Sequence, residues 1–103
     1  MSRLAKLQEF LAADPNDSFT RYAIGLEYAN AKNYPEAIAT LEYLREHDPK
    51  YVPTYYMLGG YYHEISNDEN AKSVYQAGIK IARSTGDTHA ASELQAAFDE
   101  LED

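Results

Sequence analysis

An internal repeat of 34 residues constrains the fold of this chain more than any other feature. The dipeptide Asp14-Pro15 recurs as Asp48-Pro49, 34 residues further on. The same shift brings other pairs into register: Ile24 with Leu58, Gly25 with Gly59, Tyr28 with Tyr62, and Ala37 with Ala71. Proline disfavours helical geometry at the residue before it, so each Asp-Pro marks the end of a helix. A period in the thirties with helix stops at its boundary indicates a stacked array of helical repeats.

Apolar residues recur at helical spacing in six segments, and each segment has a start or stop signal. The expected helices span residues 2–13, 17–31, 33–48, 52–65, 68–84 and 87–101. The clearest start is Asn33, whose side chain can cap the amide of Glu36 while Pro35 occupies the first turn. Gly86 ends the fifth helix. No segment has the alternation or the turn dipeptides of a hairpin, so we expect an all-α chain with antiparallel neighbouring helices.

Two residue types indicate how these helices pack. Gly25 and Gly59 lie in expected helix interiors, where glycine costs up to about 1 kcal/mol relative to alanine. A helix tolerates that cost where another backbone approaches closely, which is what we expect at both positions. The chain also has ten tyrosines against three phenylalanines and no tryptophan. Tyrosine suits half-buried helix seams because its ring packs inside while its hydroxyl reaches water or a partner.

Composition and charge exclude several classes of protein. The 9 basic and 17 acidic residues give a net charge of −8, which argues against nucleic acid or an anionic membrane as the main partner. No apolar run approaches the roughly 18 residues that a bilayer span requires, and residues 1–4 do not begin a signal peptide. Cysteine is absent, which excludes disulfides and thiolate metal sites. These features favour a cytoplasmic protein.

Acidic residues concentrate at the C-terminal end of the sequence. After Arg83 there is no Lys or Arg, but there are six acidic residues: Asp87, Glu93, Asp99, Glu100, Glu102 and Asp103. We interpret this segment as a solvated, solubilising face rather than as an acidic docking tail.

The repeated motifs carry a resemblance to a known family. Residues 18–51 contain Ile24-Gly25-Leu26-Glu27-Tyr28, Tyr34-Pro35-Glu36-Ala37-Ile38 and Asp48-Pro49. Residues 52–85 contain Leu58-Gly59-Gly60-Tyr61-Tyr62, Ala71, Tyr75 and Gly78. These runs resemble the tetratricopeptide repeat (TPR), a 34-residue helix–turn–helix unit with Leu-Gly-x-x-Tyr in its first helix and a closing proline. Two positions depart from that pattern, since Arg21 replaces a large aromatic residue and Arg83 replaces the closing proline.

The resemblance implies a single domain over residues 1–103, with two full repeats at residues 18–51 and 52–85. Residues 2–15 resemble the second helix of an earlier unit, and residues 87–101 resemble the capping helix that ends such arrays. The implied fold is an all-α, TPR-like, right-handed superhelical array of about six antiparallel helices.

The residues give little support for catalysis or for metal binding. The three histidines lie on different expected elements and share no local motif. His63-Glu64 followed by Asn67 falls short of a zinc-protease motif, because asparagine occupies the position of the second ligand. Gly59-Gly60 lies within a helix and lacks the loop and the lysine of a phosphate cradle. We therefore expect no enzyme activity, no metal and no cofactor.

In proteins that resemble this one, the first helix of each unit lines a concave surface that binds a peptide. The residues that we place on this surface are Phe19, Tyr22, Leu26 and Ala29 from the first unit, and Tyr56, Gly60 and His63 from the second. The alternative for each of them is a place in the core between helices. Chaperone-binding members hold a C-terminal carboxylate with Lys, Arg and Asn, but here the matching positions are Tyr22, Leu26, Tyr56 and Gly60. We expect a protein or peptide partner that offers apolar or aromatic side chains.

The expected function is a non-catalytic protein–protein interaction module, a small adaptor or scaffold that binds a peptide on its concave face. The alternative is a homodimerising structural module. In that case an open end of the array, with Phe10 as a candidate contact, stacks on a second copy of the chain.

Overall fold

The computed structural model describes residues 2–102, which form six α-helices and no strand. The helices are α1 (Arg3–Ala13), α2 (Ser18–Asn30), α3 (Tyr34–His47), α4 (Pro53–Glu64), α5 (Asp68–Thr85) and α6 (Thr88–Leu101). Each boundary lies within one residue of the position predicted from the sequence. The prediction of an all-α helical repeat fold is therefore confirmed for the described residues. Asp103, the last residue of the predicted acidic face, lies outside them.

Side-chain caps begin most of the helices. Ser2, Asn33, Asn67 and Asp87 each accept a hydrogen bond from the backbone amide three residues further on. The prediction that Asn33 caps Glu36 is confirmed, at 3.4 Å. Gly86 follows α5 with a φ of 79°, the left-handed conformation that glycine adopts without steric cost. These caps fix the ends of the helices and hence the short connections between them.

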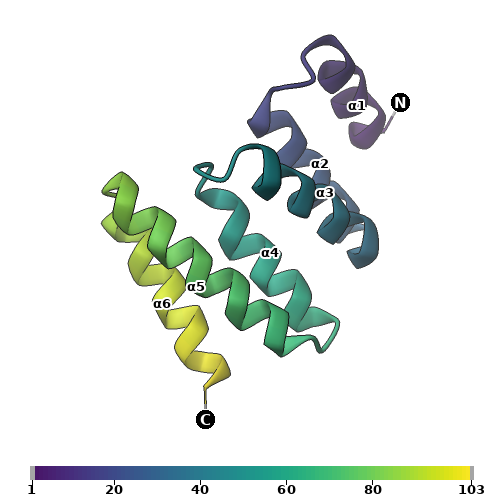
Figure 1. Ribbon diagram of the computed structural model, residues 1–103. Coiled ribbons are helices and arrows are strands. Elements are labelled where there is room, and N and C mark those ends of the chain that lie inside the picture. The colour runs from purple at the N-terminus through teal and green to yellow at the C-terminus, as the bar shows by residue number, and fades with distance from the viewer. Residues whose placement is uncertain (1, 103) are drawn as a thin grey trace.

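The helices stack in chain order, with α1 and α6 at opposite ends of the stack (Figure 1). Each helix packs against its neighbours in sequence, and in addition α2 contacts α4 and α4 contacts α6. The helices therefore form two layers, with α2, α4 and α6 in one layer and α3 and α5 in the other. The stack measures 44 × 30 × 19 Å.

The core lies between the two layers and excludes α1. Residues with no more than 1% of their surface exposed come from α3, α4, α5 and α6: Ala37, Leu41, Thr54, Leu58, Ala71, Val74, Ala82 and Leu94. In contrast, α1 has no buried residue, and its Phe10 is 60% exposed. An ion pair of 2.5 Å between Arg3 and Glu27 joins α1 to α2.

Two helix-interior glycines, Gly25 and Gly59, face large side chains of the next helix. A Cβ atom on Gly25 would lie 2.7 Å from Cδ2 of Leu41, and one on Gly59 would lie 2.7 Å from Cδ1 of Tyr75. The expectation that another backbone approaches closely is wrong at both positions, because a side chain of the facing helix fills the space instead. The nearest backbone atom to the Gly25 position is the Ala37 carbonyl oxygen, at 3.7 Å. Glycine is used here because the facing side chains are large.

Candidate interaction groove

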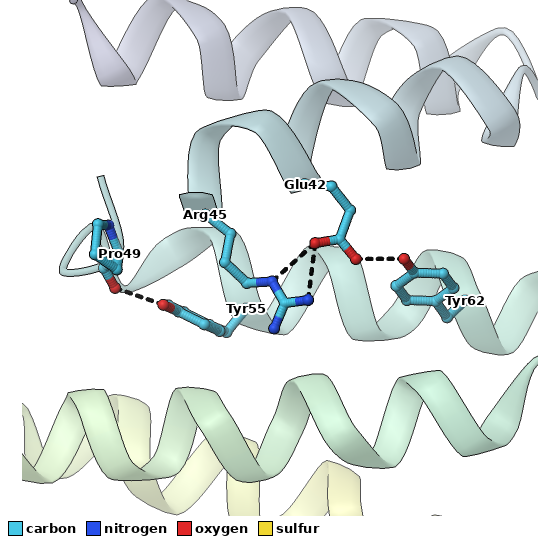
Figure 2. Close-up of polar contacts among 5 residues, drawn as sticks. All are labelled: Glu42, Arg45, Pro49, Tyr55 and Tyr62. Atoms are coloured by element: carbon cyan, nitrogen blue, oxygen red, sulfur yellow. Dashed lines mark hydrogen bonds and ion pairs between the residues drawn. The ribbon is translucent and has the colours of Figure 1, made fainter. Parts of the chain in front are cut away.

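The orientation of α4, which carries the candidate site, is fixed by polar contacts with α3 and the connection that follows it (Figure 2). Tyr62 donates a hydrogen bond from its hydroxyl to one carboxylate oxygen of Glu42. The other oxygen pairs with Nε and Nη2 of Arg45, at 2.9 and 2.8 Å. Tyr55 donates to the carbonyl of Pro49 at 2.5 Å. Burial, followed by the bond to Glu42, raises the pKa of Tyr62 to about 12, so this hydroxyl keeps its proton at neutral pH.

Tyr55 and Tyr62 are seven residues apart, which is two helical turns, so they lie on the same face of α4. Both are almost fully buried, at 2% and 9% exposure. The contacts that they make hold this face of α4 against α3. Tyr56 and Gly60 lie on another face of the helix, one turn apart, and this face is turned toward solvent.

A first hollow, which we call the tyrosine cavity, lies beside this exposed face and has a volume of about 390 Å³. Four tyrosines from three parts of the chain line it: Tyr34, Tyr56, Tyr61 and Tyr75. Ala29, with its methyl group, and Gly60, with no side chain, leave room between the rings. The charged residues of the lining are Lys32 and Glu64, one of each sign.

A second hollow, which we call the acidic cavity, has a volume of about 270 Å³. Its lining includes Tyr22 from α2, Tyr56 and Met57 from α4, and Leu94 from α6. On the side of α6 its lining includes two carboxylates, Asp87 and Glu93, and the imidazole of His89. Because Tyr56 and Met57 line both cavities, the two hollows adjoin one another on the surface of α2, α4 and α6. We refer to them together as the groove.

The tyrosine rings of the groove pack against one another and against neighbouring tyrosines. Tyr56 and Tyr75 lie 6.5 Å apart between ring centroids, and Tyr34 and Tyr61 lie 5.9 Å apart, both in tilted arrangements. Both separations lie within the range of about 4.5–7 Å between ring centroids at which aromatic side chains attract one another. Burial, followed by the neighbouring tyrosines, raises the pKa of Tyr61 to about 12. Burial also raises the pKa of Tyr22. These hydroxyls are therefore neutral and can both donate and accept hydrogen bonds.

Comparison with known proteins identifies the family. The tetratricopeptide repeat family model matches residues 52–85. A tetratricopeptide repeat domain protein from Salinibacter ruber, solved by NMR, is 43% identical with a TM-score of 0.83. The match covers 86% of this chain and 90% of that protein. The chain belongs to the tetratricopeptide repeat family.

Two further structures support the assignment of the TPR fold. A crystal structure of a tetratricopeptide repeat domain protein from Salinibacter ruber is 41% identical, with a TM-score of 0.79, and the match covers 84% of this chain and 97% of that one. A protein from Bordetella parapertussis is 24% identical, with a TM-score of 0.84 over 98% of this chain and 88% of that one, and shows the fold alone. No curated protein matches the sequence. The predicted resemblance to the TPR family is confirmed, and this fold is generally a non-catalytic protein–protein interaction module.

The structure brings four of the seven predicted site residues of this TPR protein into the groove. Tyr22 lines the acidic cavity, Ala29 and Gly60 line the tyrosine cavity, and Tyr56 lines both. Ala29 is only 8% exposed, so it also belongs to the core. Tyr56 is 47% exposed and is the most accessible tyrosine of the groove.

The remaining three predicted residues line neither cavity. Phe19 is 66% exposed near the start of α2, and Leu26 is half-buried. His63 is exposed and forms a hydrogen bond of 2.7 Å from its Nδ1 to a carboxylate oxygen of Asp68. The hydrogen bond and the charge of Asp68 raise the pKa of His63.

Reasoning from the sequence missed the residues that reach the groove from outside α2 and α4. Tyr34 is the first residue of α3, and Tyr75 belongs to α5. Asp87 is the residue that caps the start of α6, and Glu93 lies within that helix. One signal could have identified the contribution of α6. The 34-residue shift that pairs Tyr22 with Tyr56 leads next to Ala90, which lines the acidic cavity.

The described residues contain no cluster of side chains that could bind a metal. Residues 2–102 bring no three His, Asp or Glu side chains together in a group that could hold an ion. Over the same residues, no helix of this TPR protein is both long enough and apolar enough to cross a bilayer.

Proposed function

We propose that the chain is a non-catalytic, cytoplasmic protein–protein interaction module that binds an extended or helical segment of a partner protein in the groove. In the arrangement that we propose, residues 18–51 and 52–85 are two full repeats. Residues 2–15 form a half unit, residues 87–101 are the capping helix, and residues 1–103 are one domain. The groove then corresponds to the surface lined by the first helix of each unit.

The observation that carries this proposal is the exposure of Tyr56 between two adjoining cavities. Tyr56 is 47% exposed, although its ring lies 6.5 Å from that of Tyr75 and it shares the cavity lining with Met57. Large aromatic side chains in a concave surface provide both apolar area and hydrogen bonds, and they dominate the binding energy of many interfaces. A partner side chain that enters either cavity buries the Tyr56 ring.

The lining of the groove favours apolar or aromatic partner side chains over a C-terminal carboxylate. Lys32 is the cation of the tyrosine cavity, and it shares that cavity with Glu64. The acidic cavity holds Asp87 and Glu93, with the single histidine His89 beside Glu93. A carboxylate would meet these negative charges without a cluster of cations to neutralise it. The net charge of −8 similarly disfavours nucleic acid.

A pull-down from lysate with the wild type and with the double variant Tyr22→Ala/Tyr56→Ala tests the proposal. We expect a partner that binds the wild type and is lost from the double variant, while the helical circular dichroism of the two proteins is the same. Tyr43→Ala is the matched control, because Tyr43 is 45% exposed on α3 and lines neither cavity. A partner that the double variant retains in full would contradict the proposal.

The exposed side of α1 favours the alternative, a homodimer through the end of the array. This helix has no buried residue, and Phe10 is 60% exposed. If this end is the functional surface, light scattering shows a mass that rises from that of the monomer to that of the dimer as the protein concentration increases. Phe10→Ala then returns the protein to the monomer. A concentration-independent monomer mass contradicts this alternative.

A further inference from the structure

We infer that the partner segment places an arginine or lysine side chain in the acidic cavity, next to an apolar side chain in the tyrosine cavity. This inference rests on the proposed function and specifies the chemistry of the partner. The inference depends on three properties of the acidic cavity: its charge, the positions of its aromatic rings and its size. It also depends on the different lining of the tyrosine cavity.

The charge of the acidic cavity comes from two carboxylates. Its lining within residues 2–102 contains Asp87, Glu93 and one histidine, His89, but no Lys or Arg. The side chain of Glu93 is 54% exposed, and its carboxylate lies 3.6 Å from Nε2 of His89 within the same cavity. One oxygen of Asp87 accepts the amide of Ala90 at 3.0 Å as the cap of α6. The carboxylate of Glu93 and the second oxygen of Asp87 are then the acceptors for a bound cation.

The walls of the same cavity suit the rest of a long basic side chain. Tyr22 and Tyr56 offer aromatic rings, which attract a guanidinium or an ammonium group through the ring quadrupole. Met57, Val52 and Leu94 offer apolar surface to the methylene groups of its stem. A volume of about 270 Å³ lies just below the range of pockets that enclose a drug-sized molecule, so one or two side chains fill it.

The tyrosine cavity has a different preference. Its charges, Lys32 and Glu64, are of opposite sign, while Tyr34, Tyr61 and Tyr75 supply most of its aromatic surface. A basic side chain therefore gains less there than in the acidic cavity, and an apolar or aromatic side chain gains more. Since the cavities share Tyr56 and Met57, two neighbouring side chains of one segment can occupy both. The combination of one basic and one apolar residue is the recognition pattern that the groove selects.

A library of random peptides displayed on phage provides a probe that does not require the natural partner. We expect peptides selected on the wild type to be enriched in arginine or lysine beside an apolar residue. Synthetic copies of these peptides are then measured by fluorescence anisotropy against Asp87→Asn/Glu93→Gln, which removes both charges and keeps the helix cap, because asparagine also caps. We expect binding to weaken about fivefold, the size of one favourable, partly solvated ion pair.

The control variant is Glu9→Gln/Glu46→Gln, which changes the net charge by the same amount. Glu9 and Glu46 are exposed and line neither cavity. Equal weakening in this control would show that net charge alone attracts the peptides, and the inference would be wrong.

Two other outcomes separate the inference from the proposed function. Selected peptides that lack basic residues and lose binding to Tyr22→Ala/Tyr56→Ala would overturn the inference and leave the proposed function standing. Peptides that bind the double variant as tightly as they bind the wild type would count against both the inference and the proposed function. A failure to select any peptide would do the same.

Discussion

The two adjacent glycines of α4 provide a test of the packing between α4 and α5. A Cβ atom on Gly59 would overlap the ring of Tyr75, with Cδ1 and Cζ both 2.7 Å away. A Cβ atom on Gly60 would have only the Tyr75 hydroxyl within reach, at 4.0 Å. Both positions lie inside the same helix, so Gly→Ala at either one gains the same helix propensity, about 1 kcal/mol. The difference in stability between the two variants therefore isolates the steric cost at position 59.

We expect Gly60→Ala to raise the free energy of unfolding by up to about 1 kcal/mol. Inserting a methyl group into a packed core costs about 1–3 kcal/mol, and Tyr75 is only 6% exposed, so its ring has little freedom to move away. Gly59→Ala should therefore be less stable than Gly60→Ala by about 1–3 kcal/mol. Urea denaturation followed by circular dichroism at 222 nm measures both values. Each kcal/mol also corresponds to about 4–8 °C in Tm for a domain of this size.

A second substitution identifies the Tyr75 ring as the cause. Tyr75→Leu removes the ring, so adding Gly59→Ala to this variant should cost less than adding it to the wild type. The double-mutant cycle should show a favourable coupling of about 1 kcal/mol or more. If Gly59→Ala is as stable as Gly60→Ala, or if the two substitutions are additive, the packing argument is wrong.

Three other substitutions test local features. Within residues 2–102 the fully buried hydroxyl of Thr54 has no hydrogen-bond partner, so Thr54→Val should stabilise the protein by about 1 kcal/mol in the same denaturation assay, and a loss would contradict this. Gly86→Ala should lower the free energy of unfolding by about 1 kcal/mol, because a φ of 79° is a left-handed conformation that strains any residue with a side chain. No atom crowds the added methyl group, so an unchanged stability would contradict this backbone strain. The bond to Asp68 raises the pKa of His63, so the bond's contribution to stability is complete below about pH 6.5 and is lost as the pH rises through the folded-state pKa. An NMR titration should place this pKa above 6.5 and show that Asp68→Asn lowers it, whereas an equal midpoint in both proteins would exclude the bond.

The sequence predicted the helices of this protein closely because their ends carry strong local signals. Proline after Asp14 and Asp48, the cap at Asn33 and the glycine at position 86 each act on the backbone within a few residues. Such signals can be read without knowing the rest of the fold. The 34-residue period then predicted which helices repeat one another, and so the family.

The groove was predicted less completely because its residues come from different helices. The matched register identified Tyr22 and Tyr56, which share one position in the repeat. Periodicity within a helix could not show whether Ala29 is buried, because that depends on how closely its neighbours approach. Tyr34, Tyr75 and Glu93 reach the groove through the angles between helices, and these angles depend on packing rather than on sequence spacing.

The incomplete cover of α1 has a consequence for how stability is distributed along the stack. In a linear array each helix gains its stability from the helices beside it, so a terminal helix with one neighbour opens at a lower free energy than an internal one. Helix α1 contacts only one other helix, α2, and none of its residues is buried. Helix α4, in contrast, contacts α2, α3, α5 and α6. Amide protons of α1 should therefore exchange with solvent long before those around Leu58, and a protease should shorten the molecule from this end while the groove stays folded.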